Sequence, residues 1–521
     1  MLAPNAHLSQ VAANARVLTP LVSGSDSGQT AQTTSPVNLS PLASIPVSDQ
    51  AAVTEAFAKS RHVQHSWERM STKVRAEIML RFHDLLFKDR ETGLDIIQAE
   101  TGKARLHAVE ELLAVALVAR HYARTADKLL RPKRHAGPMP LLSPALEVRH
   151  PRGVIGVIAP WNYPLVLSIG DALAALMAGN GAVLKPDSQT PLTALWAINL
   201  LYEAGLPEDL VGVVYGSGAV LGPVIVGEAD YLMFTGSTAV GRQVAAQCGE
   251  RLISCSMELG GKNAMIICGD ANVKRAAEIA VRACFTNAGQ LCISIERIYV
   301  DRRIARDFLD EFVDRTSKLR VSAALGWGAD MGSLISGRQL DVVNSHVTDA
   351  VGKGATVLAG GRPRPDGGPL CYEPTILTGV TPEMTCYAEE TFGPVVSVYP
   401  VDGDEEAIEL SNDTDYGLNG SVITGSPRRG REIARRLRVG SVNINEGYAT
   451  SFATTSAPMG GFGVSGIGRR HGSEGLLKYT EAQTISTQRL MGWGVPPLLN
   501  DRIWSETLVA FVRGLKLMGK K

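Results

Sequence analysis

The feature that most constrains this chain is a regular alternation of short apolar runs and amphipathic stretches, which begins near residue 146. Short apolar runs are typical of buried strands, and stretches with apolar residues three and four apart are typical of helices. Strands that alternate with helices form parallel sheets covered by helices, so the sequence predicts an α/β fold. The pattern resumes after residue 262, which predicts a second α/β unit. The expected strands cover residues 146–150, 154–158, 182–185, 210–214, 231–234, 264–268 and 297–300, and the expected helices cover 72–90, 105–130, 169–178, 194–204, 240–248 and 276–287.

Size and charge narrow the class further. The chain has 521 residues, more than the roughly 250–300 at which single cores stop growing. Its 52 basic and 52 acidic residues balance, so no nucleic-acid partner is expected. No secretory signal is visible, and no run approaches the roughly 18 apolar residues of a membrane-spanning helix. Seven irregularly spaced cysteines without a C-x-x-C motif favour free thiols, and the expected location is the cytoplasm.

The two ends of the chain differ from the rest. Residues 1–48 are rich in Ser, Thr, Gln, Asn and Pro and show little apolar periodicity, which predicts a mobile N-terminal arm; the alternative is a partly ordered lead-in. Residues 491–521 place apolar side chains at helical spacing with basic residues on or beyond the other side, which predicts an amphipathic C-terminal extension. We expect this helix to pack on the body or on a neighbouring subunit; the alternative is that it lies on a membrane surface.

One glycine-containing turn has the character of a phosphate-binding element. Residues 234–241 read Phe-Thr-Gly-Ser-Thr-Ala-Val-Gly and connect an expected strand to an expected helix. Glycines let the backbone approach a phosphate closely, and a helix N-terminus offers free N–H groups. The spacing matches neither G-x-G-x-x-G nor a P-loop, so a plain strand-to-helix turn is the alternative.

Three further residues stand in settings that suit catalysis. Cys292 follows a small, flexible loop, as an accessible nucleophile requires, although most single cysteines are buried and inert. Glu258 stands in an apolar, glycine-rich stretch that favours a general base with a raised pKa; the alternative is a carboxylate held by backbone N–H groups. Asn162 follows a strand, where its amide either donates to an oxyanion or forms a turn.

Taken together, these motifs resemble the aldehyde dehydrogenase superfamily in order and spacing. Within it, the chain resembles the NADP-dependent succinic semialdehyde dehydrogenase type of actinobacteria through residues 185–190, 292–297 and 468–472. The wider resemblance spans roughly residues 45–490. It rests on seven blocks, namely residues 160–164, 184–186, 234–241, 258–262, 287–292, 389–394 and 458–462.

The resemblance implies oxidation of an aldehyde to a carboxylic acid, with succinate semialdehyde as the expected substrate. Cys292 would attack the aldehyde carbon to form a thiohemiacetal that becomes a thioester. The Asn162 amide and the Cys292 backbone N–H would hold the oxyanion. Glu258 would activate the water that releases the acid.

The resemblance also implies a nicotinamide cofactor, NADP, with NAD as the alternative. In NAD-preferring relatives a Glu stands at the position of Ser188 and binds the adenosine 2′-hydroxyl, whereas neutral Ser188 suits a 2′-phosphate. Asp187 is expected to face away, because neighbouring side chains of a strand point to opposite sides. The implied cofactor contacts are Trp161, Lys185, Ser188, Gly236, Ser237, Gly241, Glu390 and Phe392.

Two departures from the resemblance bear on the substrate and on redox control. The two arginines expected to hold the substrate carboxylate are Gly170 and Thr286 here, so the loop 450–456 is the expected replacement. Ser294 stands where some relatives carry a second thiol, so no local disulfide with Cys292 is expected.

Other functions fit the residues less well. A broad-specificity aliphatic or aromatic aldehyde dehydrogenase would use the same machinery. A CoA-acylating enzyme usually lacks the general-base Glu, and a catalytically silent relative would not keep Cys292, Glu258 and Asn162. The ten histidines are scattered without ligand spacing, so no metal site is expected.

The resemblance implies an architecture of a cofactor-binding domain, a catalytic domain and a small β arm. The arm is expected to pair with another subunit, which protects its strand edges, so a homodimer or homotetramer is expected. The expected boundaries are 49–130 and 153–260 for the cofactor-binding domain, 261–475 for the catalytic domain, and 131–152 and 476–490 for the arm.

Overall fold

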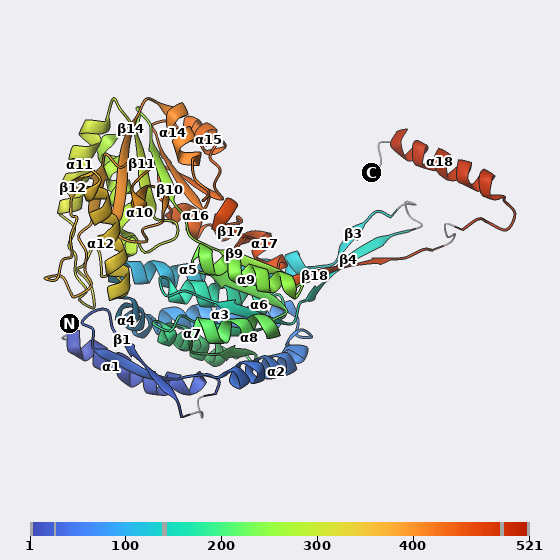
Figure 1. The fold of residues 1–521 in the computed structure, drawn as a ribbon. Helices are drawn as coiled ribbons and strands as arrows, with labels where there is room; N and C mark the ends of the chain where they lie inside the picture. Colours follow the sequence, from blue (N-terminus) through green and yellow to red (C-terminus); the bar gives the residue numbers. More distant parts are fainter. Residues whose placement is uncertain (1–3, 25–27, 138–142, 490–493, 518–521) are drawn as a thin grey trace.

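A computed structural model describes residues 4–24, 28–137, 143–489 and 494–517. Figure 1 shows two bodies, each built around a twisted sheet with helices against it, and a thin β arm that projects from one of them. Both sheets are mostly parallel, so the predicted α/β class is confirmed. Each sheet has one antiparallel edge pairing, β17 with β9 and β12 with β13, which makes the sheets mixed rather than purely parallel.

The first sheet has six strands in the order β17-β9-β8-β5-β6-β7. Its central strands are apolar and almost fully buried, because helices cover both faces and leave no polar side to alternate. The strands are β5 (Val154–Ile158), β6 (Gly181–Lys185), β7 (Val211–Val213), β8 (Tyr231–Thr235), β9 (Cys255–Glu258) and β17 (Gly466–Ile467). The helices of this body are α2 (Gln50–Trp67), α3 (Thr72–Lys88), α4 (Arg90–Thr101), α5 (Arg105–Leu130), α6 (Asp171–Met177), α7 (Pro191–Glu203), α8 (Gly218–Glu228) and α9 (Thr238–Glu250).

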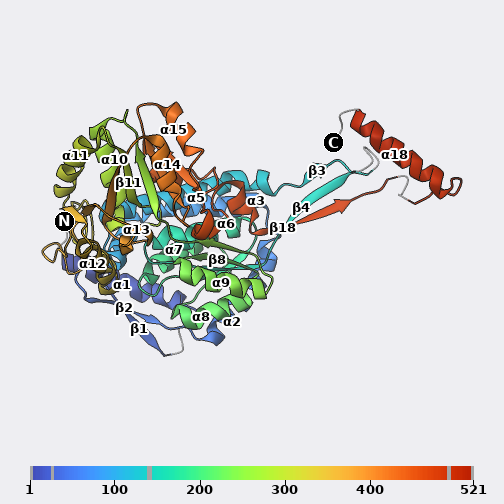
Figure 2. The ribbon, with the colours of Figure 1, turned by 45° about the horizontal axis from the view of Figure 1, so that its top comes forward.

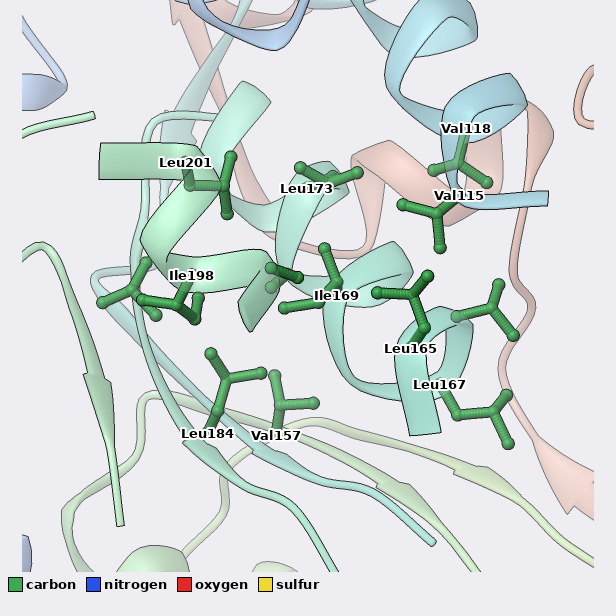
Figure 3. Close-up of a cluster of buried hydrophobic side chains, with 14 of the residues drawn as sticks. Val115, Val118, Val157, Leu165, Leu167, Ile169, Leu173, Leu184, Ile198 and Leu201 are labelled. Atoms are coloured by element: carbon green, nitrogen blue, oxygen red, sulfur yellow. The ribbon is translucent and has the colours of Figure 1, made fainter. Parts of the chain in front are cut away.

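The largest buried cluster joins this sheet to its helices. In Figure 3, Val157 and Leu184 of the sheet face Ile169 and Ile198 from the helices above them. Val115 of α5 adds a second helical layer behind these residues. Residues 166–170 form a π-helical turn that runs directly into α6. This packing fixes the segment that follows β5, and that segment carries the candidate site residue Asn162.

The second sheet has seven strands in the order β12-β13-β14-β11-β10-β15-β16. Its apolar cluster includes residues of α10, where Ala276, Ala280 and Ala283 are buried with little volume and let the helix approach the sheet. The strands are β10 (Asn263–Ile267), β11 (Ile295–Asp301), β12 (Thr356–Ala359), β13 (Thr375–Thr378), β14 (Val395–Val401), β15 (Asn419–Ile423) and β16 (Ser441–Ile444). The helices are α10 (Val273–Phe285), α11 (Ala305–Ser317), α12 (Gly337–Gly352), α13 (Thr385–Ala388), α14 (Asp404–Asn412), α15 (Pro427–Ala434) and α16 (Ala449–Ala453).

The projecting arm is an antiparallel sheet made from two distant parts of the chain. Its strands are β3 (Lys133–His135), β4 (Ala145–Pro151) and β18 (Thr480–Ser486), in the order β18-β4-β3. β18 pairs with β4 along its whole length, from Thr480 opposite Pro151 to Ser486 opposite Ala145. Figures 1 and 2 show the arm extending away from both bodies, so its two outer strands have free edges.

The N-terminal segment is not the mobile arm that its polar composition predicts. It forms α1 (Pro4–Leu18) and a hairpin of β1 (Thr30–Thr34) and β2 (Pro41–Pro46), which lie along the first body in Figure 1. Val11, Ala15 and Leu18 are buried at helical spacing, and Ile45 of the hairpin is fully buried. Few apolar residues carry this packing, which is why composition concealed it.

Two C-terminal segments complete the fold. β17 and α17 (Gly472–Leu477) pack on β9, α5 and α6 of the first body, although the sequence boundary at residue 475 placed them in the second unit. The boundary is corrected because β17 lies at the edge of the first sheet, although the chain before it belongs to the second body. The final helix, α18 (Asp501–Leu517), lies beyond the arm, and Trp504 is its one buried described residue. None of the described helices is long and apolar enough to cross a membrane.

Candidate active site

A deep groove runs along the edge where the strands of the first sheet end, and it encloses about 1370 Å³ of space that includes its open mouth. Asn162 follows β5, Thr235 ends β8 and Glu258 ends β9. Parallel strands bring their carboxyl ends to one edge, which is the usual place for a ligand in an open α/β sheet. The groove is lined by Trp161, Asn162, Ser188, Gly236, Ser237, Glu258, Cys292, Glu390 and Phe392 among others.

The loop before Cys292 has an unusual backbone. Asn287 and Ala288 both adopt left-handed conformations, with φ of 54° and 55°, and non-glycine residues rarely do so. The Asn287 side chain helps to hold the loop, because its Nδ2 donates to the carbonyl oxygen of Gln290 at 3.0 Å. Asn263 Nδ2 donates to the Cys292 carbonyl oxygen at 2.8 Å. The half-buried Cys292 therefore sits on a loop fixed from both sides.

Asn162 lies beside this loop and is tied to it. Its Nδ2 donates to the carbonyl oxygen of Gln290 at 3.1 Å. The backbone carbonyl oxygen of Asn162 accepts from Asn287 Nδ2 at 3.1 Å and from Lys103 Nζ at 2.8 Å. The residue whose amide the sequence assigned to an oxyanion is therefore held by three hydrogen bonds close to Cys292.

A fully buried ion pair supports that arrangement. Lys103 Nζ lies 2.9 Å from Glu111 Oε2, and neither side chain is exposed to solvent. The other carboxylate oxygen of Glu111 accepts from the backbone N–H groups of Leu165 and Val166, at 2.6 and 3.2 Å. The pair thus holds both sides of the turn that carries Asn162. Sequence reasoning missed it, because α5 was interpreted only through its apolar face.

Glu258 is buried at the end of β9. Its Oε1 has no hydrogen-bond partner among the described residues, and burial raises its pKa to about 7, partly opposed by the positive charge of Arg470. A side chain at Gly460 would place Cβ 3.1 Å from this oxygen. The carboxylate therefore faces a small space that glycine keeps open, and a pKa near 7 suits a general base.

The thiol of Cys292 is protonated at neutral pH in this arrangement. Burial raises its pKa to about 12, and the charge of Arg470 lowers it only in part. For this thiol to attack an electrophile, its proton must leave during the attack, or a bound cofactor must change the surroundings of the thiol and so lower its pKa.

Glu390 enters the groove on a loop of the second body. Its Oε1 accepts from the Gly261 backbone N–H at 3.0 Å, and burial raises its pKa to about 8. A Cβ at Gly260 would lie 2.2 Å from Glu390 Oε2, so a side chain there would displace this carboxylate. Gly260 therefore allows the Glu390 carboxylate to approach. Gly261 allows the Cys292 loop to approach, since a Cβ at Gly261 would lie 2.8 Å from the Cys292 carbonyl oxygen.

A second buried ion pair fixes the loop that carries Glu390. Lys262 Nζ lies 2.5 Å from Glu296 Oε2, and both side chains are almost fully buried. Glu296 in turn accepts from the backbone N–H groups of Thr391 and Phe392 at 3.0 Å. Lys262 therefore contributes through position. Glu296 is a further residue that sequence reasoning did not single out.

Of the remaining predicted cofactor residues, Trp161, Ser188, Gly236, Ser237 and Phe392 line the groove, whereas Lys185 and Gly241 do not. The Trp161 and Phe392 rings meet edge to face with centroids 5.4 Å apart. Ser237 caps α9 by accepting from the Val240 N–H at 3.4 Å, next to Gly236 at the groove wall. Gly241 does not line the groove; a Cβ there would lie 2.4 Å from Leu259, so it allows α9 to pack closely.

The end of the groove where the adenosine of a cofactor is expected differs from expectation in one respect. β6 ends at Lys185, and residues 187–190 form a turn closed by a bond from the Thr190 N–H to the Asp187 carbonyl oxygen. Strand alternation therefore stops, and Asp187 lines the groove together with exposed Ser188. The expectation that Asp187 faces away is wrong. Lys185 is buried, and its Nζ donates to the Pro186 carbonyl oxygen at 3.3 Å.

The positions that depart from the resemblance have structural partners of their own. Thr286 is buried, and its hydroxyl accepts from Tyr448 at 3.1 Å. Ser294 donates to carbonyl oxygens at the end of α10, at 3.1 and 3.2 Å. Gly170 and Phe452 border a smaller cavity together with Leu167, which also lines the groove. Among the described residues, no other member of the loop 450–456 lines either space.

Comparison with known proteins identifies the family to which these features belong. The model of the aldehyde dehydrogenase family matches residues 22–485. A Mycolicibacterium smegmatis protein is 54% identical over 480 residues, covering 92% of this chain and 93% of that protein. It is named as a succinate-semialdehyde dehydrogenase (NADP+), and its name marks the assignment as provisional.

Two proteins of lower sequence identity are also similar to this chain. The 3-sulfolactaldehyde dehydrogenase of Pseudomonas putida is 34% identical over 463 residues, covering 88% of this chain and 94% of that protein. The crystal structure of betaine aldehyde dehydrogenase from Staphylococcus aureus in complex with NAD+ superposes with a TM-score of 0.88 at 28% identity, covering 95% of this chain and all of that one.

Proposed function

The chain belongs to the aldehyde dehydrogenase family, and from that premise we propose that it oxidises succinate semialdehyde to succinate with NADP. Members of this family oxidise aldehydes to carboxylic acids. The proposal for the substrate rests on the names of relatives such as the one from Mycolicibacterium smegmatis, which is 54% identical. The observation that carries the chemistry is the meeting of Cys292, Asn162 and Glu258 in one groove.

Cys292 begins the reaction by attacking the aldehyde carbon, which forms a thiohemiacetal. The negative charge that develops on the aldehyde oxygen is held by the Asn162 amide and the Cys292 backbone N–H. To do so, Asn162 Nδ2 exchanges its bond with the Gln290 carbonyl oxygen for one with the substrate. One oxyanion donor of this kind contributes about 2.7–4 kcal/mol to a transition state.

Glu258 acts in the second half of the reaction. Once Cys292 holds the acyl group as a thioester, a water must be deprotonated to release the acid. The unpartnered Oε1 of Glu258 is free to accept that proton, and its pKa of about 7 leaves a large ionised fraction at neutral pH. The same carboxylate is available to take the proton of the Cys292 thiol, whose pKa is high.

The groove suits a dinucleotide. A nicotinamide cofactor, when bound, supplies the hydride acceptor. The N-terminus of α9 at Gly236 and Ser237 offers free N–H groups to a pyrophosphate. Half-buried Glu390, which lines the groove, is placed to accept from a ribose hydroxyl. Ser188 at the adenosine end carries no charge that would repel a 2′-phosphate, which supports NADP.

The proposal extends to the whole protein. We assign the cofactor-binding domain to the body with the first sheet, including β17 and α17, and the catalytic domain to the body with the second sheet. The free edges of the arm support a homodimer or homotetramer. All seven cysteines are free thiols, which supports a cytoplasmic location.

Kinetics with a matched substrate panel test the proposal. Succinate semialdehyde, butanal and benzaldehyde should be assayed with NADP and NAD, and the products analysed with and without CoA. We expect the highest kcat/KM for succinate semialdehyde with NADP, and free succinate as product in both cases. Equal kcat/KM for all aldehydes would identify a broad-specificity enzyme, and a CoA-dependent acyl product would identify an acylating one.

A further inference from the structure

A small cavity adjoins the active-site groove; it encloses about 410 Å³ of space that includes its opening to solvent, and Arg470 is one of its lining residues. The wall is mostly apolar, comes from α5, the π-helical turn and α6, and includes Val166 and Met459. Leu167 lines both this cavity and the groove, so the two spaces are neighbours. Arg470 and His471 line the same cavity.

Arg470 is held in place on two of its three nitrogens. Nε and Nη2 lie 3.1 and 2.9 Å from Asp171 Oδ2, and Nη2 also donates to the Thr235 hydroxyl. Its backbone pairs with Met459 in both directions. Nη1 has no hydrogen-bond partner within the described part of the chain, and 9% of the residue is exposed. One N–H edge of a rigid guanidinium is therefore left for a ligand.

His471 supplies a second unused polar atom. Its side chain is buried with 8% exposure, it borders the same cavity, and its Nδ1 has no partner among the described residues. Burial lowers its pKa to about 4, so the ring is neutral at pH 7 and its nitrogens share one proton. A neutral imidazole donates a hydrogen bond to an anion through the nitrogen that carries this proton.

The charges around the cavity favour an anion. Arg470 and Lys478 share the single carboxylate of Asp171, with Lys478 Nζ 3.7 Å from Oδ1, although burial lowers the pKa of Lys478. Glu258 is the other carboxylate that these cations influence, and its pKa near 7 means that it is only partly ionised. Two basic side chains thus share one carboxylate in the part of the site where Arg470 acts on Cys292, which favours an anion there.

We propose that Arg470, with His471, forms the subsite for the anionic end of the substrate, a carboxylate separated by a short chain from the aldehyde. This inference rests on the proposed function, and it names a cation where Gly170 and Thr286 offer none. A planar guanidinium fixed by Asp171 and Thr235 suits a carboxylate, because its remaining N–H groups are already aimed and lose little freedom on binding. Asp171 is then a positioning residue for Arg470.

The space at Gly170 agrees with this assignment. A Cβ at that position would meet only Val166 Cγ2, at 3.5 Å, which is ordinary contact. The absence of a side chain there leaves room between the apolar walls for the substrate chain. It also provides a position to which a cation can be moved.

The test compares succinate semialdehyde with butanal, which has the same chain length without the carboxylate. In Arg470→Gln, we expect kcat/KM for succinate semialdehyde to fall about 30-fold or more through KM, as loss of a hydrogen bond to a charged group implies. For butanal we expect a smaller fall, because loss of the Arg470 charge raises the pKa of Glu258 and this affects both aldehydes alike. The ratio of the two kcat/KM values should therefore fall about 10-fold or more. Arg470→Lys should lose about fivefold to tenfold, because an ammonium cannot reproduce the fixed fork. Gly170→Arg added to Arg470→Gln should restore part of the preference.

Arg469→Gln is the matched control, since Arg469 lies outside the cavity lining and bonds to the Gly461 carbonyl oxygen at 3.1 Å. It should keep the substrate preference. If the preference survives in Arg470→Gln, or if both aldehydes lose activity equally there, the subsite is wrong while the proposed function stands. If Arg470→Gln does not fold, an unchanged preference in Arg470→Lys would equally show that the subsite is wrong. A wild-type protein that does not prefer succinate semialdehyde contradicts the proposed substrate and the subsite together.

Discussion

The ammonium group of Lys103 lies 2.8 Å from the backbone carbonyl oxygen of Asn162, 59 residues away in the chain. Lys103 is also paired with Glu111 inside the protein, with no exposure of either side chain. A buried pair of this kind is weak evidence for extra stability, because desolvation offsets most of the attraction. Its consequence is geometric: it fixes the turn that presents the Asn162 amide toward Cys292.

Lys103→Met tests that geometry. The change leaves the Glu111 carboxylate buried without its partner, which typically costs about 3–5 kcal/mol in the free energy of unfolding. Displacement of Asn162 by about 1 Å lowers kcat by up to about 100-fold. Denaturant unfolding and steady-state kinetics measure the two effects.

Lys59→Met is the control for Lys103→Met. Lys59 pairs with Glu55 on an exposed helix surface at 2.9 Å, and such pairs contribute about 0–1 kcal/mol. Normal kcat in folded Lys103→Met protein would show that the pair does not position Asn162.

The two halves of the reaction are separable by mutation. Cys292→Ala removes the only atom that forms a covalent bond to the substrate, so turnover should be abolished. Glu258→Gln should keep a burst of NADPH, seen as absorbance in a stopped-flow experiment, and lose steady-state turnover by about 100-fold or more. Loss of the burst as well would assign Glu258 to the activation of Cys292, whose pKa of about 12 requires a base.

The pH dependence follows from the environment of Glu258. Burial raises its pKa to about 7, so the carboxylate is protonated and inactive as a base below that pH and ionised above it. Steady-state hydrolysis should therefore rise with pH along a limb with an apparent pKa of about 7 and level off above it. The limb should be absent from the residual rate of Glu258→Gln. A wild-type rate that is flat between about pH 5.5 and 8.5 would rule out this role.

Much of the frame was predictable because it is local in sequence. The helix expected at 105–130 is α5 with the same limits, since one apolar face runs through it. The strand at 154–158 is β5, because a short run of β-branched residues suits a buried parallel strand. The groove positions at the ends of β5 and β8 follow from the same periodicity, whereas β9 (Cys255–Glu258) was not among the expected strands.

What the sequence concealed depends on tertiary contacts. The Lys103–Glu111 and Lys262–Glu296 pairs join residues whose charges resemble ordinary surface positions until their burial is known. The left-handed conformation of Ala288 is imposed by its surroundings, since nothing in a short Ala side chain favours it. The orientation of Asp187 was not predictable, because the end of β6 at Lys185 is set by the turn that follows rather than by any local breaker.

Gly260→Ala tests the close approach at the nicotinamide end. The added Cβ would lie 2.2 Å from Glu390 Oε2, so Glu390 must move. We expect kcat/KM for the cofactor to fall by about 10-fold to 100-fold, with little change in overall folding. Gly249→Ala is the matched control: its Cβ meets nothing within 4 Å in helix α9, so it should raise stability by about 0.5–1 kcal/mol and leave kcat/KM unchanged. Unaltered cofactor kinetics in Gly260→Ala would show that Glu390 is not a ribose contact.

The adenosine end of the groove bears on cofactor choice through two neighbouring side chains. Ser188 is exposed in the turn after β6, and its backbone carbonyl oxygen accepts from the Tyr215 hydroxyl at 3.1 Å. Because this hydrogen bond uses the backbone of Ser188, the side chain at position 188 can be changed without loss of the bond from Tyr215. The carboxylate of Asp187 accepts from the Gln189 N–H at 2.9 Å. The positive charge of Lys185 partly balances the negative charge of Asp187.

These contacts predict opposite effects of two substitutions on the ratio of kcat/KM for NADP to that for NAD. Wild type should favour NADP, because Ser188 is neutral and able to donate to a 2′-phosphate. Ser188→Glu places a carboxylate where it repels that phosphate and accepts from a 2′-hydroxyl, so the ratio should fall by about 30-fold or more. Asp187→Asn keeps an acceptor for Gln189 but removes a charge that lines the groove, so the ratio should rise several-fold. Isothermal titration with each cofactor separates binding from catalysis. A wild-type preference for NAD, or a ratio that Ser188→Glu leaves unchanged, would show that position 188 does not select the cofactor.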